Sequence, residues 1–106
     1  MDAETTHLEI TIEGTTPPVL VLAGELDPAT ASTFDAAVDK VLGDGASELV
    51  VDMAALTFID SSGLRSFISA HKRIAPALLR LRRPTPFALQ LLSITGLDQQ
   101  FQIDTE

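Results

Sequence analysis

Two adjacent hydroxyl groups, those of Ser61 and Ser62, are the side chains best placed for chemistry in this sequence. They lie between an apolar run, residues 49–58, that predicts a buried strand and an amphipathic run, residues 64–74, that predicts a helix. The first turn of a helix has unpaired backbone N–H groups and the positive end of the helix dipole, so it favours an anion. A serine in this turn can therefore accept a phosphate without unfolding its surroundings.

Helix capping and phosphorylation are two interpretations of the serine pair, and both can hold. Serine is a favoured N-cap residue, and either Asp60 or Ser61 can cap the helix while Ser62 is modified. Phosphorylation adds roughly 1.5 to 2 negative charges at pH 7, and Gly63 lets a partner approach the backbone closely. The new charge would mainly reject a partner that docks over Gly63 and Leu64, so the switch changes an interface and not the fold.

A nucleophilic serine hydrolase is the third interpretation, and the sequence argues against it. Such a nucleophile needs a general base within reach and a third group that orients the base. The G-x-S-x-G turn of many hydrolases is absent. His71 follows Ser62 by nine residues on the apolar face of the same predicted helix, which is ~13 Å along the axis. His7 lies near the amino terminus, so we expect no enzyme.

Composition argues against several other classes of protein. The 106 residues predict a single domain, residues 1–106, with a core over about residues 8–104. Cysteine is absent, the acids lack ligand spacing and no phosphate-binding G-x-x-x-x-G-K-[ST] loop exists, so we expect no metal, no cofactor and no NTPase activity. No apolar run approaches the ~20 residues of a membrane span, and Met1-Asp2-Ala3-Glu4 is not typical of a signal peptide. We therefore expect a cytoplasmic location without membrane insertion.

The net charge of −8 is unevenly distributed along the chain. Residues 61–97 contain no Asp or Glu, whereas all fifteen acids lie elsewhere with only Lys40 to balance them. Six basic residues form this block: Arg65, Lys72, Arg73, Arg80, Arg82 and Arg83. The block is either a solvated face or a surface that docks a partner by charge. A chain this acidic is a poor candidate for direct nucleic-acid binding.

The remaining pattern predicts strands that alternate with helices, which is typical of an α/β sheet with helical cover. Five segments have the composition of short strands: residues 8–12, 19–23, 49–58, 79–82 and 101–103. We expect the fourth of them near an edge of the sheet. Asp27, a favoured N-cap, opens a first helix that Gly43 ends. Phe87, Leu91 and Ile94 have the spacing of a third helix, which Thr85-Pro86 opens and Gly96 ends.

Several segments of this chain resemble the motifs of the STAS family, the bacterial anti-sigma factor antagonists. They occur in the family's order and spacing: Gly24-Glu25-Leu26-Asp27, Val51-Asp52, Asp60-Ser61-Ser62-Gly63-Leu64, Pro84-Thr85-Pro86 and Thr95-Gly96-Leu97-Asp98. The resemblance implies the STAS fold, a mixed sheet of four or five strands with helices packed mainly on one side. Asp52, within a predicted strand, is interpreted as structural.

The resemblance implies a regulatory binding protein. Its unphosphorylated form would bind an anti-sigma factor, a serine kinase with a histidine-kinase-like ATPase fold, and so release a sigma factor. Ser62 matches the family's phospho-acceptor; the kinase would phosphorylate it to block binding, and a serine phosphatase would reset it. The residues assigned to the partner face of this monomer are Asp27, Asp60, Ser61, Gly63, Leu64 and Arg65.

Two alternatives stay open at this point. STAS domains also serve as subunits of membrane transport systems, where they contact an ATPase. A nucleotide-binding domain in a signalling scaffold is the other alternative.

The chain also departs from the family pattern at Ile74-Ala75-Pro76-Ala77, where Gly residues are common, and this affects the expected shape of that loop.

Overall fold

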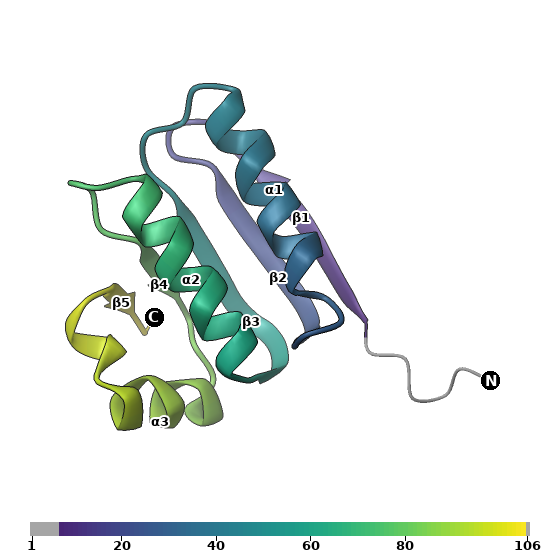
Figure 1. Cartoon of the computed structure of the whole chain (residues 1–106), viewed down its shortest axis with the longest axis vertical. Helices are drawn as coiled ribbons and strands as arrows, with labels where there is room; N and C mark the ends of the chain where they lie inside the picture. Colours follow the sequence, from purple (N-terminus) through teal and green to yellow (C-terminus); the bar gives the residue numbers. More distant parts are fainter. Residues whose placement is uncertain (1–6, 106) are drawn as a thin grey trace.

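Five strands form a single mixed sheet in the computed structural model, which describes residues 7–105 (Figure 1). They are β1 (Leu8–Glu13), β2 (Val19–Leu26), β3 (Val50–Ile59), β4 (Arg80–Arg82) and β5 (Gln102–Asp104). Their order across the sheet is the order along the chain. β1 pairs antiparallel with β2, and every later pair is parallel. The carboxyl ends of β2 to β5 therefore share one edge.

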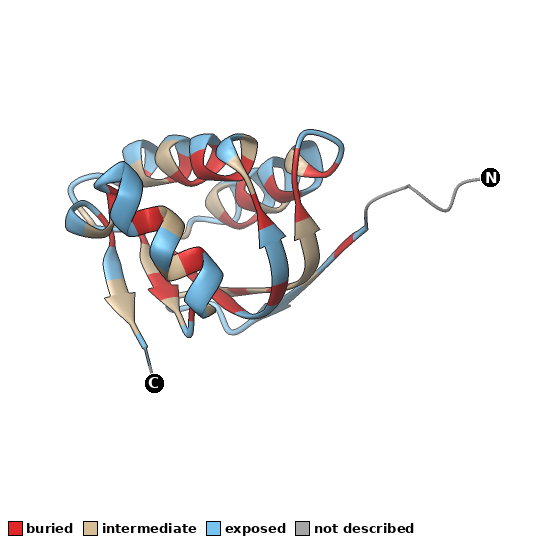
Figure 2. Cartoon of the chain, turned by 90° about the horizontal axis from the view of Figure 1, so that it is seen from below, coloured by how far each residue is buried: buried red, intermediate tan, exposed pale blue. Residues whose placement is uncertain are grey.

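Each parallel pair of strands is joined through a helix. The helices are α1 (Ala31–Gly43), α2 (Ser61–Arg73), α3 (Pro86–Thr95) and the short 3-10 helix η1 (Leu97–Gln99). Figure 2 shows the helices on one side of the sheet, with the buried residues between the two layers. The fold predicted from the sequence, a mixed sheet of four or five strands with helices mainly on one side, is confirmed, and the sheet has five strands.

Aromatic side chains join the helices to the core. The Phe34 ring from α1 and the Phe67 ring from α2 have centroids 5.3 Å apart, and Phe101 meets Phe67 edge-on at 6.5 Å. All three are buried together with the aliphatic side chains of β2 and β3. This packing fixes the first turns of α1 and α2 against the edge of the sheet where the serines lie.

Two predicted boundaries and one predicted position differ from the structure. The first helix begins at Ala31 rather than next to Asp27, because residues 28–30 form a separate turn. It includes Gly43, and the left-handed backbone conformation falls on Gly45 with φ +104°. The strand predicted near an edge, β4, is internal, since it pairs with β3 on one side and β5 on the other.

The third helix has the predicted ends but an unexpected orientation. The Thr85 hydroxyl accepts the Ala88 N–H at 3.2 Å, and Gly96 ends the helix with φ +77°. Its buried side chains are Ala88 and Leu92, whereas Phe87 and Ile94 are 49% and 72% exposed. Two of the three residues that identified this helix therefore face solvent.

Candidate functional site

The ends of β2 and β3 bring the two predicted acidic residues together. Leu26 is paired with Ile59 across the two strands, and the Asp60 N–H donates to the Leu26 carbonyl at 3.3 Å. Asp27 and Asp60 therefore follow paired positions at the carboxyl edge of the sheet, where α/β proteins place their sites.

Asp60 is the N-cap of α2, which decides between the two caps that the sequence allowed. Its backbone is extended, and its Oδ1 atom accepts the N–H groups of Ser62 at 2.9 Å and Gly63 at 3.4 Å. Ser61 and Ser62 are consequently the first two residues of the helix. Ser61 is exposed and Ser62 is half-buried, and the Ser62 hydroxyl has no hydrogen-bond partner within residues 7–105. This hydroxyl is open to modification while capping is performed by its neighbour.

Asp27 stabilises the turn that leads into α1. Its Oδ1 atom accepts the N–H groups of Ala29 at 2.9 Å and Thr30 at 3.2 Å. The Thr30 hydroxyl in turn donates to the Glu25 carbonyl at 2.7 Å. Asp27 is itself buried and bonds within the turn before the helix, so its structural role is local and its predicted place on a partner face stays a prediction.

An open groove of about 460 Å³ runs between the first turns of α1 and α2. It is lined by Pro28, Ala31, Asp35, Ser62, Arg65, Ser66 and Ser69. The structure therefore brings Ser62 and Arg65 into one concave surface. Asp35 on the opposite wall was missed, because only the packing of α1 on α2 places it there. For the groove wall formed by α2, the sequence did carry a signal, which is the spacing of Ser62, Ser66 and Ser69 along one helix.

Gly63 and Leu64 have an internal role. A Cβ atom on Gly63 would lie 2.7 Å from Ile59 Cγ1 and 2.8 Å from Leu26 Cγ. Leu64 is buried in the core. Close packing of α2 on the ends of β2 and β3 thus explains the glycine without any partner, and the predicted partner contacts of these two residues remain untested.

The basic block is largely neutralised by acids from other parts of the chain. Four ion pairs involve it: Arg73 with Asp39 at 2.6 Å, Arg80 with Asp104 at 3.2 Å, Arg82 with Asp52 at 2.8 Å, and Arg83 with Asp52. Among the described residues, Arg65 and Lys72 are the members of the block without an ion pair. These pairs join strands and helices, so what remains of the solvated or docking patch is Arg65, beside the groove, and Lys72, in the last turn of α2.

Asp52 is the charge at the centre of these pairs. Its side chain is buried, and its Oδ1 atom also accepts the Ala54 N–H at 3.0 Å. Burial raises the pKa of Asp52, but the bonds from Ala54, Arg83 and Arg82 outweigh it and hold the pKa below its ordinary value. Asp52 is therefore an ionised structural residue that joins β3 to β4, as interpreted from the sequence.

The histidines give no support to a hydrolase. His71 Nδ1 accepts the Leu79 N–H at 3.0 Å, and its ring lies edge-on against Phe101 at 5.3 Å. His7 Nε2 lies 3.5 Å from a carboxylate oxygen of Glu9 on the exposed start of β1. Neither imidazole is bonded to Ser62, so neither histidine is placed as a general base for this hydroxyl.

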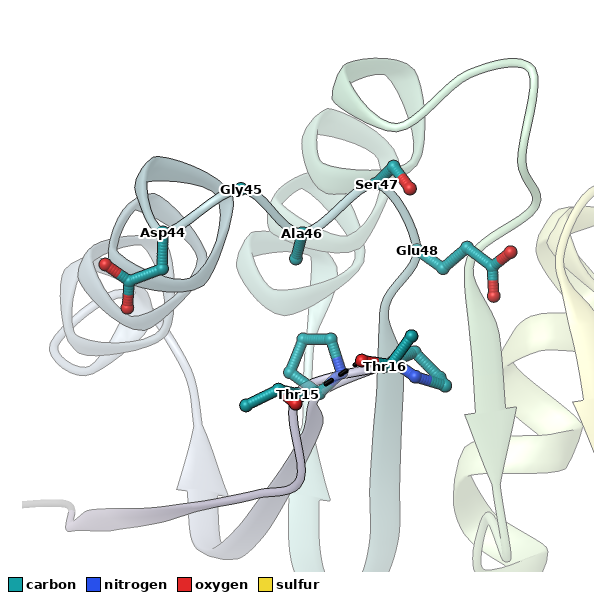
Figure 3. A pocket seen from close by; sticks show the side chains of 9 residues that line it. Thr15, Thr16, Asp44, Gly45, Ala46, Ser47 and Glu48 are labelled. Carbon is teal, nitrogen blue, oxygen red and sulfur yellow. Dashed lines mark hydrogen bonds between the residues drawn. The ribbon is translucent and has the colours of Figure 1, made fainter.

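A second open pocket, of about 370 Å³, lies at the opposite end of the strands (Figure 3). It is formed by the loop before β2 and the loop before β3, with Thr15, Thr16, Asp44 and Glu48 among its lining residues. The Asp44 carboxylate lies 3.5 Å from the Lys40 ammonium group.

Within residues 7–105 no group of three potential metal ligands occurs, and no helix is long and apolar enough to cross a membrane.

The family model described as "Mlab, STAS domain" matches residues 11–103, so the chain belongs to the STAS domain family. Anti-sigma-F factor antagonist RsfB of Mycobacterium tuberculosis is 28% identical over 93 residues, which cover 80% of this chain and 70% of RsfB. The family predicted from the sequence is therefore confirmed.

Two solved structures show the same fold. An anti-sigma factor antagonist from Mycobacterium paratuberculosis has a TM-score of 0.82 at 24% identity, covering 94% of this chain and 87% of that chain. The anti-sigma factor antagonist SpoIIAA in its unphosphorylated form has a TM-score of 0.76 at 20% identity, covering 94% and 90%.

Proposed function

We propose that this protein is an anti-sigma factor antagonist switched by phosphorylation of Ser62. Its unphosphorylated form binds an anti-sigma factor with serine kinase activity and so releases a sigma factor. The similarity to RsfB, which is named for this function, supports the proposal. SpoIIAA, which has the same fold, has been solved in unphosphorylated and phosphorylated forms.

The observation that carries the proposal is the position of the Ser62 hydroxyl. It lies in the first turn of α2, lines a groove and has no hydrogen-bond partner among the described residues, because Asp60 performs the capping. The helix N-terminus and Arg65 favour a phosphate at this point, whereas Asp35 and Asp60 oppose it. The phosphate is therefore tolerated by the fold, and it changes the charge of the groove.

Ser62 acts in this proposal as a substrate of the partner. The γ-phosphoryl group of ATP is transferred to Ser62 Oγ, the hydroxyl proton goes to a base of the kinase, and ADP leaves. A serine phosphatase restores the hydroxyl by hydrolysis. The added charge and volume then keep the partner from the groove, while the fold stays unchanged.

The test combines phosphorylation and binding. Purified wild-type chain is incubated with ATP and, one at a time, each anti-sigma factor of the kinase fold from the source organism. We expect one phosphate, on Ser62, that is lost in Ser62→Ala and kept in the neighbouring control Ser61→Ala. Ser62→Asp should fold normally and bind the kinase at least tenfold more weakly. Phosphate on Ser61 instead, or equal binding by the Ser62→Asp variant, contradicts the proposed switch.

A pull-down from cells distinguishes the alternatives of other classes. Recovery of a transport ATPase, with no phosphate on Ser62 under any growth condition, favours the transport-subunit alternative. A rise in melting temperature with ATP or GTP alone favours the nucleotide-binding alternative, because a ligand that binds only the native state must stabilise it.

A further inference from the structure

Helix α3 has an apolar surface on the side that faces solvent. None of its ten residues, Pro86–Thr95, is charged. Ala88 and Leu92 face the core, yet Phe87 and Ile94 are 49% and 72% exposed. The polar residues Gln90, Ser93 and Thr95 are exposed as well, so the apolar part of the outer surface is the face that carries Phe87 and, seven residues later, Ile94.

The exposed side of α3 continues onto the end of β3. Phe58, 40% exposed, stacks on Phe87 with ring centroids 6.0 Å apart and an angle of 21° between the rings. β4 pairs only with the first residues of β3, and α3 contacts β3. The α3 patch, defined here as Phe58, Phe87, Leu91 and Ile94, thus begins two residues before Asp60. It is continuous with the edge of the sheet that carries the phosphorylation site.

The size of the α3 patch limits what can cover it. From the ~150–250 Å² that a large aromatic side chain can bury, the patch exposes on the order of 300 Å². A stable interface needs roughly 800 Å² from each partner. A second copy held by this patch alone would therefore be too weakly bound, and two chains of net charge −8 also repel each other. The remaining area must come from an adjoining surface, which is the Ser62 edge.

We propose that the α3 patch is where the anti-sigma factor anchors, through an uncharged apolar segment that covers Phe58 and Phe87. This inference rests on the proposed function and extends its binding face beyond the groove. The anchoring segment is uncharged because α3 offers no side chain to pair with a buried charge. A few residues commonly supply most of the affinity of an interface, and aromatic residues are enriched there. The patch thus supplies affinity, and Ser62 supplies the switch.

The test uses single substitutions on the patch and a matched control. Phe87→Ser and Ile94→Ser are compared with Leu78→Ser, because Leu78 is also 49% exposed but lies in the loop before β4, outside the patch. The probe is the kinase-fold anti-sigma factor of the source organism that binds the wild-type chain. We expect Kd to rise at least tenfold for Phe87→Ser and Ile94→Ser and less than twofold for Leu78→Ser. Phosphorylation of Ser62 should show a raised KM with an unchanged kcat, because only uniform binding is lost.

Each outcome assigns the failure to one claim. If Phe87→Ser and Ile94→Ser bind as wild type while Ser62→Asp does not, the anchor is refuted and the switch stands. If the wild-type chain binds none of these anti-sigma factors, the proposed function is overturned and the anchor with it. If the free chain sediments as a dimer that Ile94→Ser dissociates, a second copy covers the patch and the assignment to the anti-sigma factor is overturned.

Discussion

Replacing Gly63 by alanine tests whether packing or partner access requires glycine in the first turn of α2. The added Cβ would lie 2.7 Å from Ile59 Cγ1 and 2.8 and 2.9 Å from Leu26 Cγ and Cδ2. Carbon atoms in contact prefer about 3.5–4.0 Å. Both neighbours are buried at the ends of paired strands, so α2 or the strands must shift.

The expected magnitude follows from two opposing terms. Overpacking of a closed core costs roughly 1–3 kcal/mol, whereas alanine in place of glycine within a helix gains up to ~1 kcal/mol. Gly63→Ala should therefore lower the free energy of unfolding by about 1–2 kcal/mol. The control is Gly43→Ala at the end of α1, where a new Cβ meets no atom within 4 Å. It should leave stability unchanged or raise it by about 0.5 kcal/mol.

Urea unfolding at 25 °C, followed by far-ultraviolet circular dichroism because the chain has no Trp or Tyr, measures both effects. Gly63→Ala should unfold at a lower urea concentration than wild type and Gly43→Ala should not, with unchanged m-values for both. A Gly63→Ala variant as stable as wild type would refute the packing argument. If that variant also bound the anti-sigma factor more weakly, close approach by the partner would become the better explanation for the glycine.

Two further predictions concern the carboxylates around the site. Asp52→Asn should cost about 1–3 kcal/mol at pH 7, because it leaves Arg82 and Arg83 without their shared partner, discounted for their exposure to solvent. The folded-state pKa of Asp52 lies below its unfolded value, so the stability that Asp52 contributes is complete above about pH 4 and is lost as the pH falls through the folded-state pKa. The free energies of unfolding of wild type and Asp52→Asn should therefore differ less at pH 3 than at pH 7. A difference that is the same at both pH values contradicts the assignment. Asp60→Ala should lower the free energy of unfolding by about 0.5–2 kcal/mol, because the N-cap of α2 is lost, and Asp60→Asn should lower it less. Equal stability of wild type and Asp60→Ala in the same assay would exclude capping as the role of Asp60.

Local signals determined the parts of the fold that depend on neighbouring residues. Strand and helix alternation, a helix cap at Asp60 or Ser61 and the end of α3 at Gly96 were predicted, because periodicity and capping act within a few residues. The motif around Ser62 also indicated the STAS family, which the comparisons confirm. The role of Ser62 itself stays a prediction.

Only the tertiary structure decided features that join distant parts of the chain. The pairing of Asp52 with Arg82 spans thirty residues and depends on β4 lying beside β3. The placement of Asp35 opposite Ser62 depends on how α1 packs on α2. The exposure of Phe87 could not be predicted for the same reason: helical spacing indicates an apolar face, but the packing of the helix decides which of its sides is buried. In α3 the core side is taken by Ala88 and Leu92, which leaves Phe87 and Ile94 in solvent.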